Sequence, residues 1–111
     1  MTIQICGKVS GMPIEAAWEN FNKAERLLRE KYPDVVIINP LKLCDPITQA
    51  FKEIGYEPHY EHYMSVCLAS IKHIHMLVCL DDAHLSDGGK REMNEAWELG
   101  KEIRSLGDML K

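Results

Sequence analysis

The sequence predicts an α/β domain in which helices cover both faces of a mostly parallel sheet. Residues 35–38 form a continuous β-branched run and residues 74–80 a second apolar run. Such runs are typical of strands that are buried on both faces. They alternate with amphipathic helical segments along the chain, which indicates parallel strands joined by right-handed crossovers. We therefore expect a three-layer, flavodoxin-like or Rossmann-like sandwich with four or five strands.

The spacing of apolar side chains predicts each element. In the helical segments they recur every three or four positions, and in the strands they are contiguous. Prolines and glycines mark several of the boundaries. In chain order, the expected elements are a strand at residues 3–6, a helix at 13–31, a strand at 35–38, a short helix at 45–55, a helix at 60–72, a strand at 74–80, a helix at 89–100 and a strand at 101–104.

Two segments are less regular than the rest. Residues 41–58 contain Asp45-Pro46, a pair that opens helices, and Gly55, a residue type that ends them. We interpret this segment as a lid or an interface arm built around a short helix. The residues after Gly107 are expected to form a frayed tail.

The composition is that of one globular domain spanning residues 1–111. The chain has 111 residues, of which 46% are hydrophobic and 27% are charged, a balance that argues against a disordered protein. Its formal net charge of −4 argues against a general nucleic-acid binder, which needs a basic surface. A nucleotide remains a possible ligand, because a small nest of backbone N–H groups is enough to bind it.

The sequence indicates a cytoplasmic protein without a metal or cofactor. No apolar run has the length of a membrane span, and the first residues do not resemble a signal peptide. The four cysteines include no CxxC pair, so reduced thiols are expected. A further group of side chains has no zinc-ligand spacing and is not expected to bind metal. It consists of His59, His62, Cys67, His73 and His75.

Two polar loops, residues 7–13 and 81–89, each follow a predicted strand. In parallel sheets of this kind, ligands bind beyond the carboxyl ends of the strands. Gly7 permits a tight turn there, and Ser10 offers a hydroxyl beside a helix N-terminus, where anions bind. The alternative is an ordinary strand-to-helix turn, because the spacing matches neither a P-loop nor a dinucleotide motif.

The second loop brings a carboxylate toward the same edge of the sheet. Ser86 and Gly88 open a helix, and Glu92 follows about one turn later. A carboxylate in that position can attack an anomeric carbon or stabilise an oxocarbenium-like transition state. The alternative is that Glu92 only interacts favourably with the helix dipole. Lys90 and Arg91 either form a solvated helix face or attract a phosphate.

Three other side chains have two interpretations each. Trp18 and Trp97 lie at helical spacing from apolar residues, so a place in the core or an interface is favoured over stacking on a ligand. Asn39 ends a predicted strand. It either hydrogen-bonds a ligand or shapes the turn before Pro40.

Five short motifs occur in order along nearly the whole chain, apart from about residues 41–58. They are Gly7-Lys8-Val9-Ser10-Gly11-Met12-Pro13; Phe21, Ala24-Glu25 and Leu28; Ile37-Ile38-Asn39-Pro40; Tyr63-Met64; and Ser86, Gly88, Gly89, Glu92, Ala96 and Gly100. In this order they resemble the nucleoside 2-deoxyribosyltransferase-like superfamily. The chain looks closest to a family of small domain-of-unknown-function proteins within it.

The resemblance implies N-glycosidic chemistry on a 2-deoxynucleoside or its 5-monophosphate, by a hydrolase or a transferase. The chain is also similar to 2-deoxynucleoside 5-monophosphate N-hydrolases. Ser86 matches their serine that helps to hold the phosphate, and Glu92 matches their catalytic nucleophile. Relatives form oligomers and need no cofactor, so a homo-oligomer without a cofactor is implied. The implied substrate-binding residues are Gly7, Ser10, Gly11, Asn39, Tyr63, Ser86 and Gly88.

One departure concerns the acid that helps the base to leave. Enzymes of this superfamily usually have an Asp in a D-L-x-x-[LI] setting, where this chain has Cys67. A thiol of ordinary pKa is a poor substitute for a carboxylic acid. Tyr63, His62, Asp81 and Asp82 are alternative donors. If none of them serves, we expect the activity to be slow or lost. The rival hypothesis is a non-catalytic module that binds or senses a nucleotide.

Overall fold

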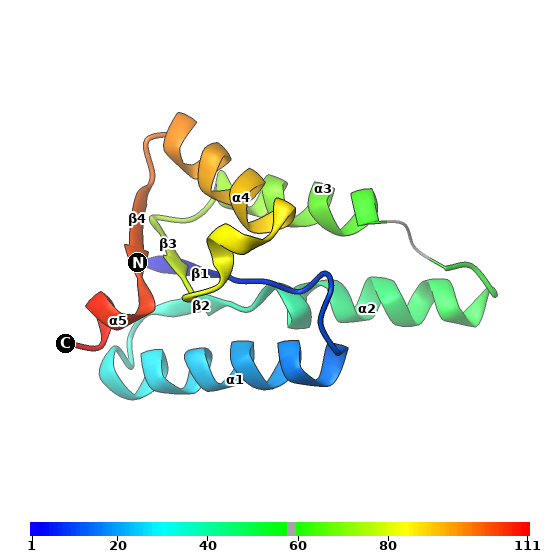
Figure 1. Cartoon of the computed structure of the whole chain (residues 1–111), viewed down its shortest axis with the longest axis horizontal. Helices are drawn as coiled ribbons and strands as arrows, with labels where there is room; N and C mark the ends of the chain where they lie inside the picture. The colour runs from blue at the N-terminus through cyan, green and yellow to red at the C-terminus, as the bar shows by residue number, and fades with distance from the viewer. Residues whose placement is uncertain (58–59) are drawn as a thin grey trace.

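Four parallel strands form the central sheet of the protein (Figure 1). The computed structural model describes residues 1–57 and 60–111. The strands are β1 (Thr2–Cys6), β2 (Val36–Ile38), β3 (Met76–Cys79) and β4 (Glu102–Ser105), in the spatial order β2-β1-β3-β4. The predicted α/β fold with a parallel sheet is therefore confirmed, with four strands.

Helices complete the layers on either side of the sheet. They are α1 (Ile14–Lys31), α2 (Pro40–Glu53), α3 (Tyr60–Ile71), α4 (Asp87–Glu98) and α5 (Leu106–Met109), with a short 3₁₀ helix, η1 (Ala83–Leu85). In Figure 1, α1 lies on one side of the sheet, and α3 and α4 lie on the other. Within the described residues, no helix has both the length and the apolar character needed to cross a membrane.

Strand β1 is the centre of the core because both of its faces are covered. Ile3 and Ile5 are completely buried against side chains of α1 such as Phe21. On the opposite face, Cys6 packs in a second buried cluster with residues of α3, β3 and α4. Gln4 is buried on this strand as well, and its Nε2 donates a hydrogen bond to the carbonyl of Cys67 at 3.2 Å. This bond ties α3 to the middle of the sheet.

Helix α2 differs from the prediction. It begins at Pro40 rather than at Asp45, and it runs through Pro46 instead of starting there. The true cap is Asn39, whose Oδ1 accepts a hydrogen bond from the N–H of Leu41 at 3.1 Å. Pro40 then takes the first helical position, where its missing N–H costs nothing. The first part of the segment 41–58, which was expected to be irregular, is therefore a regular helix of 14 residues that begins at Pro40.

Two smaller predictions were also wrong. Residues up to 89 were expected to form a loop, but Ser86 caps α4 and the helix begins at Asp87. The expected frayed tail contains the short helix α5, and the hydroxyl of Tyr32 donates a hydrogen bond to the carbonyl of Met109 at 2.7 Å. Trp97 is 77% exposed, so it lies outside the core.

Asn39 also stabilises the contact between α1 and α2, which gives a test of the fold. Its Nδ2 donates to Glu25 Oε1 at 3.2 Å, and the Glu25 carboxylate also accepts from Arg29 and Lys42. Asn39→Ala removes the cap and leaves the Glu25 bond unmade. We expect it to lower the free energy of unfolding by about 2 kcal/mol in urea denaturation.

Asn39→Ser is the matched variant, because a serine retains the capping oxygen and loses only the Nδ2 bonds to Glu25 and Asn22. It should lose about half as much stability as Asn39→Ala. Equal losses in both variants would mean that the cap contributes nothing.

Candidate functional site

A cavity of about 650 Å³ opens at the carboxyl edge of the sheet. The loop after β1, α1, α2, α3 and the first turns of α4 all contribute to its lining, which is mainly apolar. Its volume lies in the range of small-molecule sites, and its place is where parallel α/β folds bind ligands. Both loops that the sequence singled out reach this cavity.

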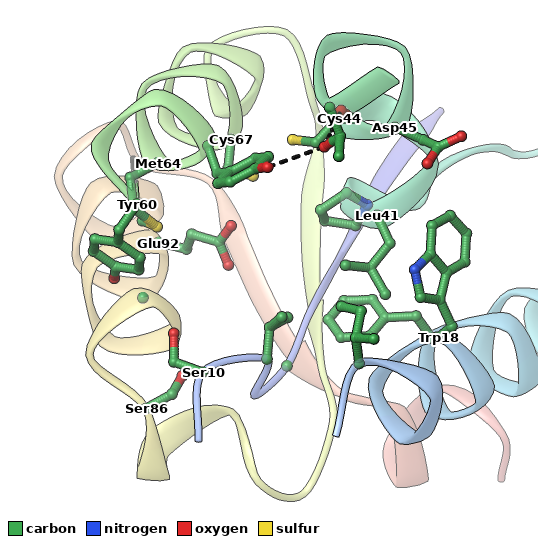
Figure 2. Close-up of a pocket in the computed structure, with 18 of the residues that line it drawn as sticks. Ser10, Trp18, Leu41, Cys44, Asp45, Tyr60, Met64, Cys67, Ser86 and Glu92 are labelled. Carbon is green, nitrogen blue, oxygen red and sulfur yellow. Dashed lines mark hydrogen bonds between the residues drawn. The ribbon is translucent and has the colours of Figure 1, made fainter. Parts of the chain in front are cut away.

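Glu92 reaches the cavity from the second turn of α4 and is only 6% exposed (Figure 2). The helix is held in place by its first turn. A Cβ on Gly89 would lie 2.0 Å from the carbonyl oxygen of Ala83, so only glycine fits against η1 at this point. The thiol of Cys6 also donates to the Gly89 carbonyl at 3.7 Å. Glu92 is therefore positioned by close contact of α4 with η1 and β1.

Burial raises the pKa of Glu92 to about 7. Interactions with the thiols of Cys6 and Cys67 lower this pKa and oppose the effect of burial only partly. The pKa of the Cys67 thiol is raised in turn by its hydrogen bond with Cys44, by burial and by the charge of Glu92. The result is a carboxylate, surrounded by neutral donors, that changes its charge near neutral pH. Groups with such shifts are frequent in active sites.

Most of the predicted site residues meet in this cavity. Its lining includes Gly7, Ser10, Tyr63, Ser86, Gly88 and Glu92. Gly11 and Asn39 lie outside the lining. Gly11 has φ +82° and serves the turn after β1, while Asn39 is buried in its bonds to α1 and α2. For Asn39 the structure therefore supports the turn-shaping interpretation.

The hydroxyl groups in the lining differ in how they are bonded. Ser86 Oγ accepts the N–H of Gly89 at 3.0 Å, so it acts as the cap of α4. The hydroxyls of Tyr63 and Thr48 form a hydrogen bond of 3.0 Å that joins α3 to α2 (Figure 2). Helix α4 points its N-terminus at the cavity, where the dipole and the first N–H groups favour an anion.

The alternative acids lie at different distances from this centre. Tyr63 lines the cavity, whereas His62 packs against the rings of Phe51 and Tyr56. Asp81 and Asp82 are not in the lining, and Asp82 accepts the N–H of Lys8 at 3.1 Å.

The structure favours one of the two interpretations of Arg91, namely that it belongs to a solvated helix face. Its guanidinium forms a bidentate pair with Glu61 of α3, at 2.7 and 3.2 Å, on the surface.

Among the described residues no group of three His, Cys, Asp or Glu side chains has metal-binding geometry. His59, one of the residues considered as a ligand, lies outside the described residues.

One family model matches residues 1–105 of the chain, that of the domain of unknown function DUF4406. The chain belongs to the DUF4406 family. A comparison with curated proteins found no match. The description of the family names no activity. A functional proposal for this DUF4406 protein therefore depends on the cavity and on Glu92.

Part of the DUF4406 cavity was missed by the sequence reasoning. One wall is a stripe of α2, with Asp45, Thr48, Gln49 and Lys52, and another includes the half-buried Trp18 of α1. From the sequence pattern, Asp45 is expected to open a helix and Trp18 to lie in the core or in an interface, so neither is expected to line a cavity. One signal in the sequence could have identified this wall. Leu41, Asp45 and Gln49 are spaced four residues apart, which places them on one face of a helix that begins at Pro40.

The raised pKa of Glu92 predicts how stability depends on pH. The folded state binds a proton at Glu92 more tightly than the unfolded state does, so the contribution of Glu92 to stability is most favourable below pH 4.5 and is lost as the pH rises toward 7. A shift of this size corresponds to about 3 kcal/mol. We expect Glu92→Gln to stabilise the protein by about that amount at pH 8 and by almost nothing at pH 4, measured by urea unfolding.

Glu98→Gln is the matched control, because Glu98 lies on the same helix and is exposed. Its effect on stability should be small and should not change between pH 5 and 8. A Glu92→Gln effect that is equally flat would contradict the raised pKa.

Proposed function

We propose that this protein binds a 2-deoxynucleoside or its 5-monophosphate and cleaves its N-glycosidic bond, as members of the nucleoside 2-deoxyribosyltransferase-like superfamily do. The observation that carries the proposal is the carboxylate of Glu92. It is buried in a largely apolar cavity at the carboxyl edge of a parallel sheet, and its pKa of about 7 lets it act in either charge state. Self-association, which the resemblance implies, stays a prediction.

In the proposed reaction, ionised Glu92 attacks the anomeric carbon. The bond between this carbon and the base nitrogen breaks, and its electron pair leaves with the base, which takes up a proton. Water then releases the sugar from Glu92 in a hydrolase, or a second base does so in a transferase. The apolar lining supports this step because it excludes bulk water and strengthens charge interactions.

The two sides of the cavity support a definite orientation of the substrate. Ser10, Ser86 and the N-terminus of α4 lie on the side of Glu92 (Figure 2), and a phosphate would be stabilised there by backbone N–H groups. Trp18 and Asp45 lie on the opposite side (Figure 2). Among the described residues neither has a stacking, hydrogen-bonding or ionic partner, so they are available to stack on and bond the base.

A second candidate is a module that binds the nucleotide without cleaving it. Cys67 favours this candidate, because it stands in the place of the expected Asp and its pKa is raised well above the usual value. Such a thiol does not protonate a leaving base efficiently, and help from an acid is typically worth about 10²–10⁴-fold in rate.

The deciding experiment is a long incubation of the protein with each 2-deoxynucleoside and each 5-monophosphate, with chromatographic detection of free base. We expect the wild type and Glu98→Gln to release base, and Glu92→Gln to be slower by about 10²-fold or more. The rate should rise with pH through about 7, because only ionised Glu92 attacks.

The other outcomes are equally clear. A protein that releases no base, but whose melting temperature rises with a nucleotide, is the binding module. Absence of both effects with every substrate would exclude the proposed ligand class.

Cys67→Asp supplies the acid that enzymes of the superfamily usually have at this place, and it tests whether the lack of this acid limits the rate. The introduced carboxyl group and Glu92 would share one proton, because two adjacent carboxylates cannot both ionise easily. We expect base release to increase by about 10²-fold. Cys67→Asn has the same size without an acidic proton and should give no increase; an increase with both variants would point to altered packing instead.

A further inference from the structure

The four cysteines form two thiol pairs, and one pair lies in the wall of the cavity. Cys44 of α2 and Cys67 of α3 are each 7% exposed and both belong to the cavity lining. Their thiols interact, and each shifts the pKa of the other. Figure 2 shows the sulfur of Cys44 turned toward Cys67, on the side of the cavity near Glu92. Both cysteines are free in this structure.

We propose that Cys44 and Cys67 form an oxidation site, at which a hydroperoxide that enters the cavity converts the two thiols into an intramolecular disulfide. This inference does not depend on the proposed reaction with nucleotides. It requires a small oxidant that can enter the cavity, two neighbouring thiols and a base. The two thiols and the base, Glu92, belong to the cavity lining.

The two thiols have different roles in the oxidation. The hydrogen bond from Cys67 lowers the pKa of the Cys44 thiol, against burial and the charge of Glu92, which raise it. Cys44 is therefore the attacking sulfur, since a thiolate is the reactive form. It takes the terminal oxygen of the hydroperoxide and becomes a sulfenic acid, while the rest of the peroxide leaves as water or an alcohol.

Glu92 serves the second step. The Cys67 thiol has one proton, which it directs to Cys44 in the reduced protein. Once Cys44 is oxidised, Cys67 interacts with the neighbouring Glu92 carboxylate, and the proton moves to Glu92 as the sulfur attacks the sulfenic acid of Cys44. The S–S bond forms, and the sulfenic oxygen leaves as hydroxide, which takes the proton from Glu92 and becomes water. The oxidised protein has lost one of the two thiols that interact with Glu92, and α2 is linked covalently to α3.

The second pair, Cys6 and Cys79, lies away from the cavity. These residues are register partners on the parallel strands β1 and β3. Neither residue is in the cavity lining. A hydroperoxide that enters the cavity therefore meets Cys44 and Cys67 and does not reach this pair.

The test is to treat the full-length protein with hydrogen peroxide and to count thiols, with peptide mapping by mass spectrometry. We expect half of the four thiols to be lost, together with two hydrogens from the intact mass, and thiols to return with a reductant. Cys44→Ser and Cys67→Ser should block the disulfide. Cys79→Ser should behave like the wild type in forming it, which makes it the matched control.

Glu92→Gln separates the two steps. In this variant the sulfenic acid of Cys44 should accumulate and be captured by a cyclic dione, because Cys67 has lost its proton acceptor. Cys44→Ala replaces Cys44→Ser if the serine variant does not fold. A disulfide mapped to Cys6 and Cys79, a disulfide between two chains, or four intact thiols after treatment would each overturn the proposal.

Discussion

The contact between the first turn of α4 and η1 determines where Glu92 is placed in this protein. At Gly89 the two segments are so close that a single Cβ would overlap the Ala83 carbonyl. Because α4 cannot move away without losing the core contact of Ala96, the direction of the helix is fixed by this glycine. Glu92, about one turn further along α4, is then directed into the cavity, whose lining is mainly apolar. The site is thus a consequence of how tightly one helix packs.

The surroundings of Glu92 explain its intermediate character. A carboxylate paired with a cation would be ionised at any physiological pH, and one without donors would be very costly to bury. Thiols lie between these limits, since they are weak hydrogen-bond donors without charge. The thiols of Cys6 and Cys67 therefore lower the pKa of Glu92 without neutralising its charge. One of these thiols, Cys67, also belongs to the proposed oxidation site.

Much of the fold could be predicted because the buried strands have an unambiguous apolar pattern. The start of α2 could not, because Asn39-Pro40 and Asp45-Pro46 are equally good opening signals, and only the contact of Asn39 with Glu25 across the fold decides between them. The loop residues and Glu92 were found from their positions after strands. Trp18 and Asp45 were missed because a helix face that lines a cavity has the same spacing as one that lines a core.

The two tryptophans of the chain lie in contrasting surroundings. Trp18 is half-buried in the cavity wall, while Trp97 is almost fully exposed on α4. An indole in water emits at longer wavelengths than one among apolar atoms, so the fluorescence spectrum of the protein is the sum of two distinguishable signals. Removing Trp97 leaves one natural chromophore at the site itself, and the occupancy of the cavity can be followed by light without any label.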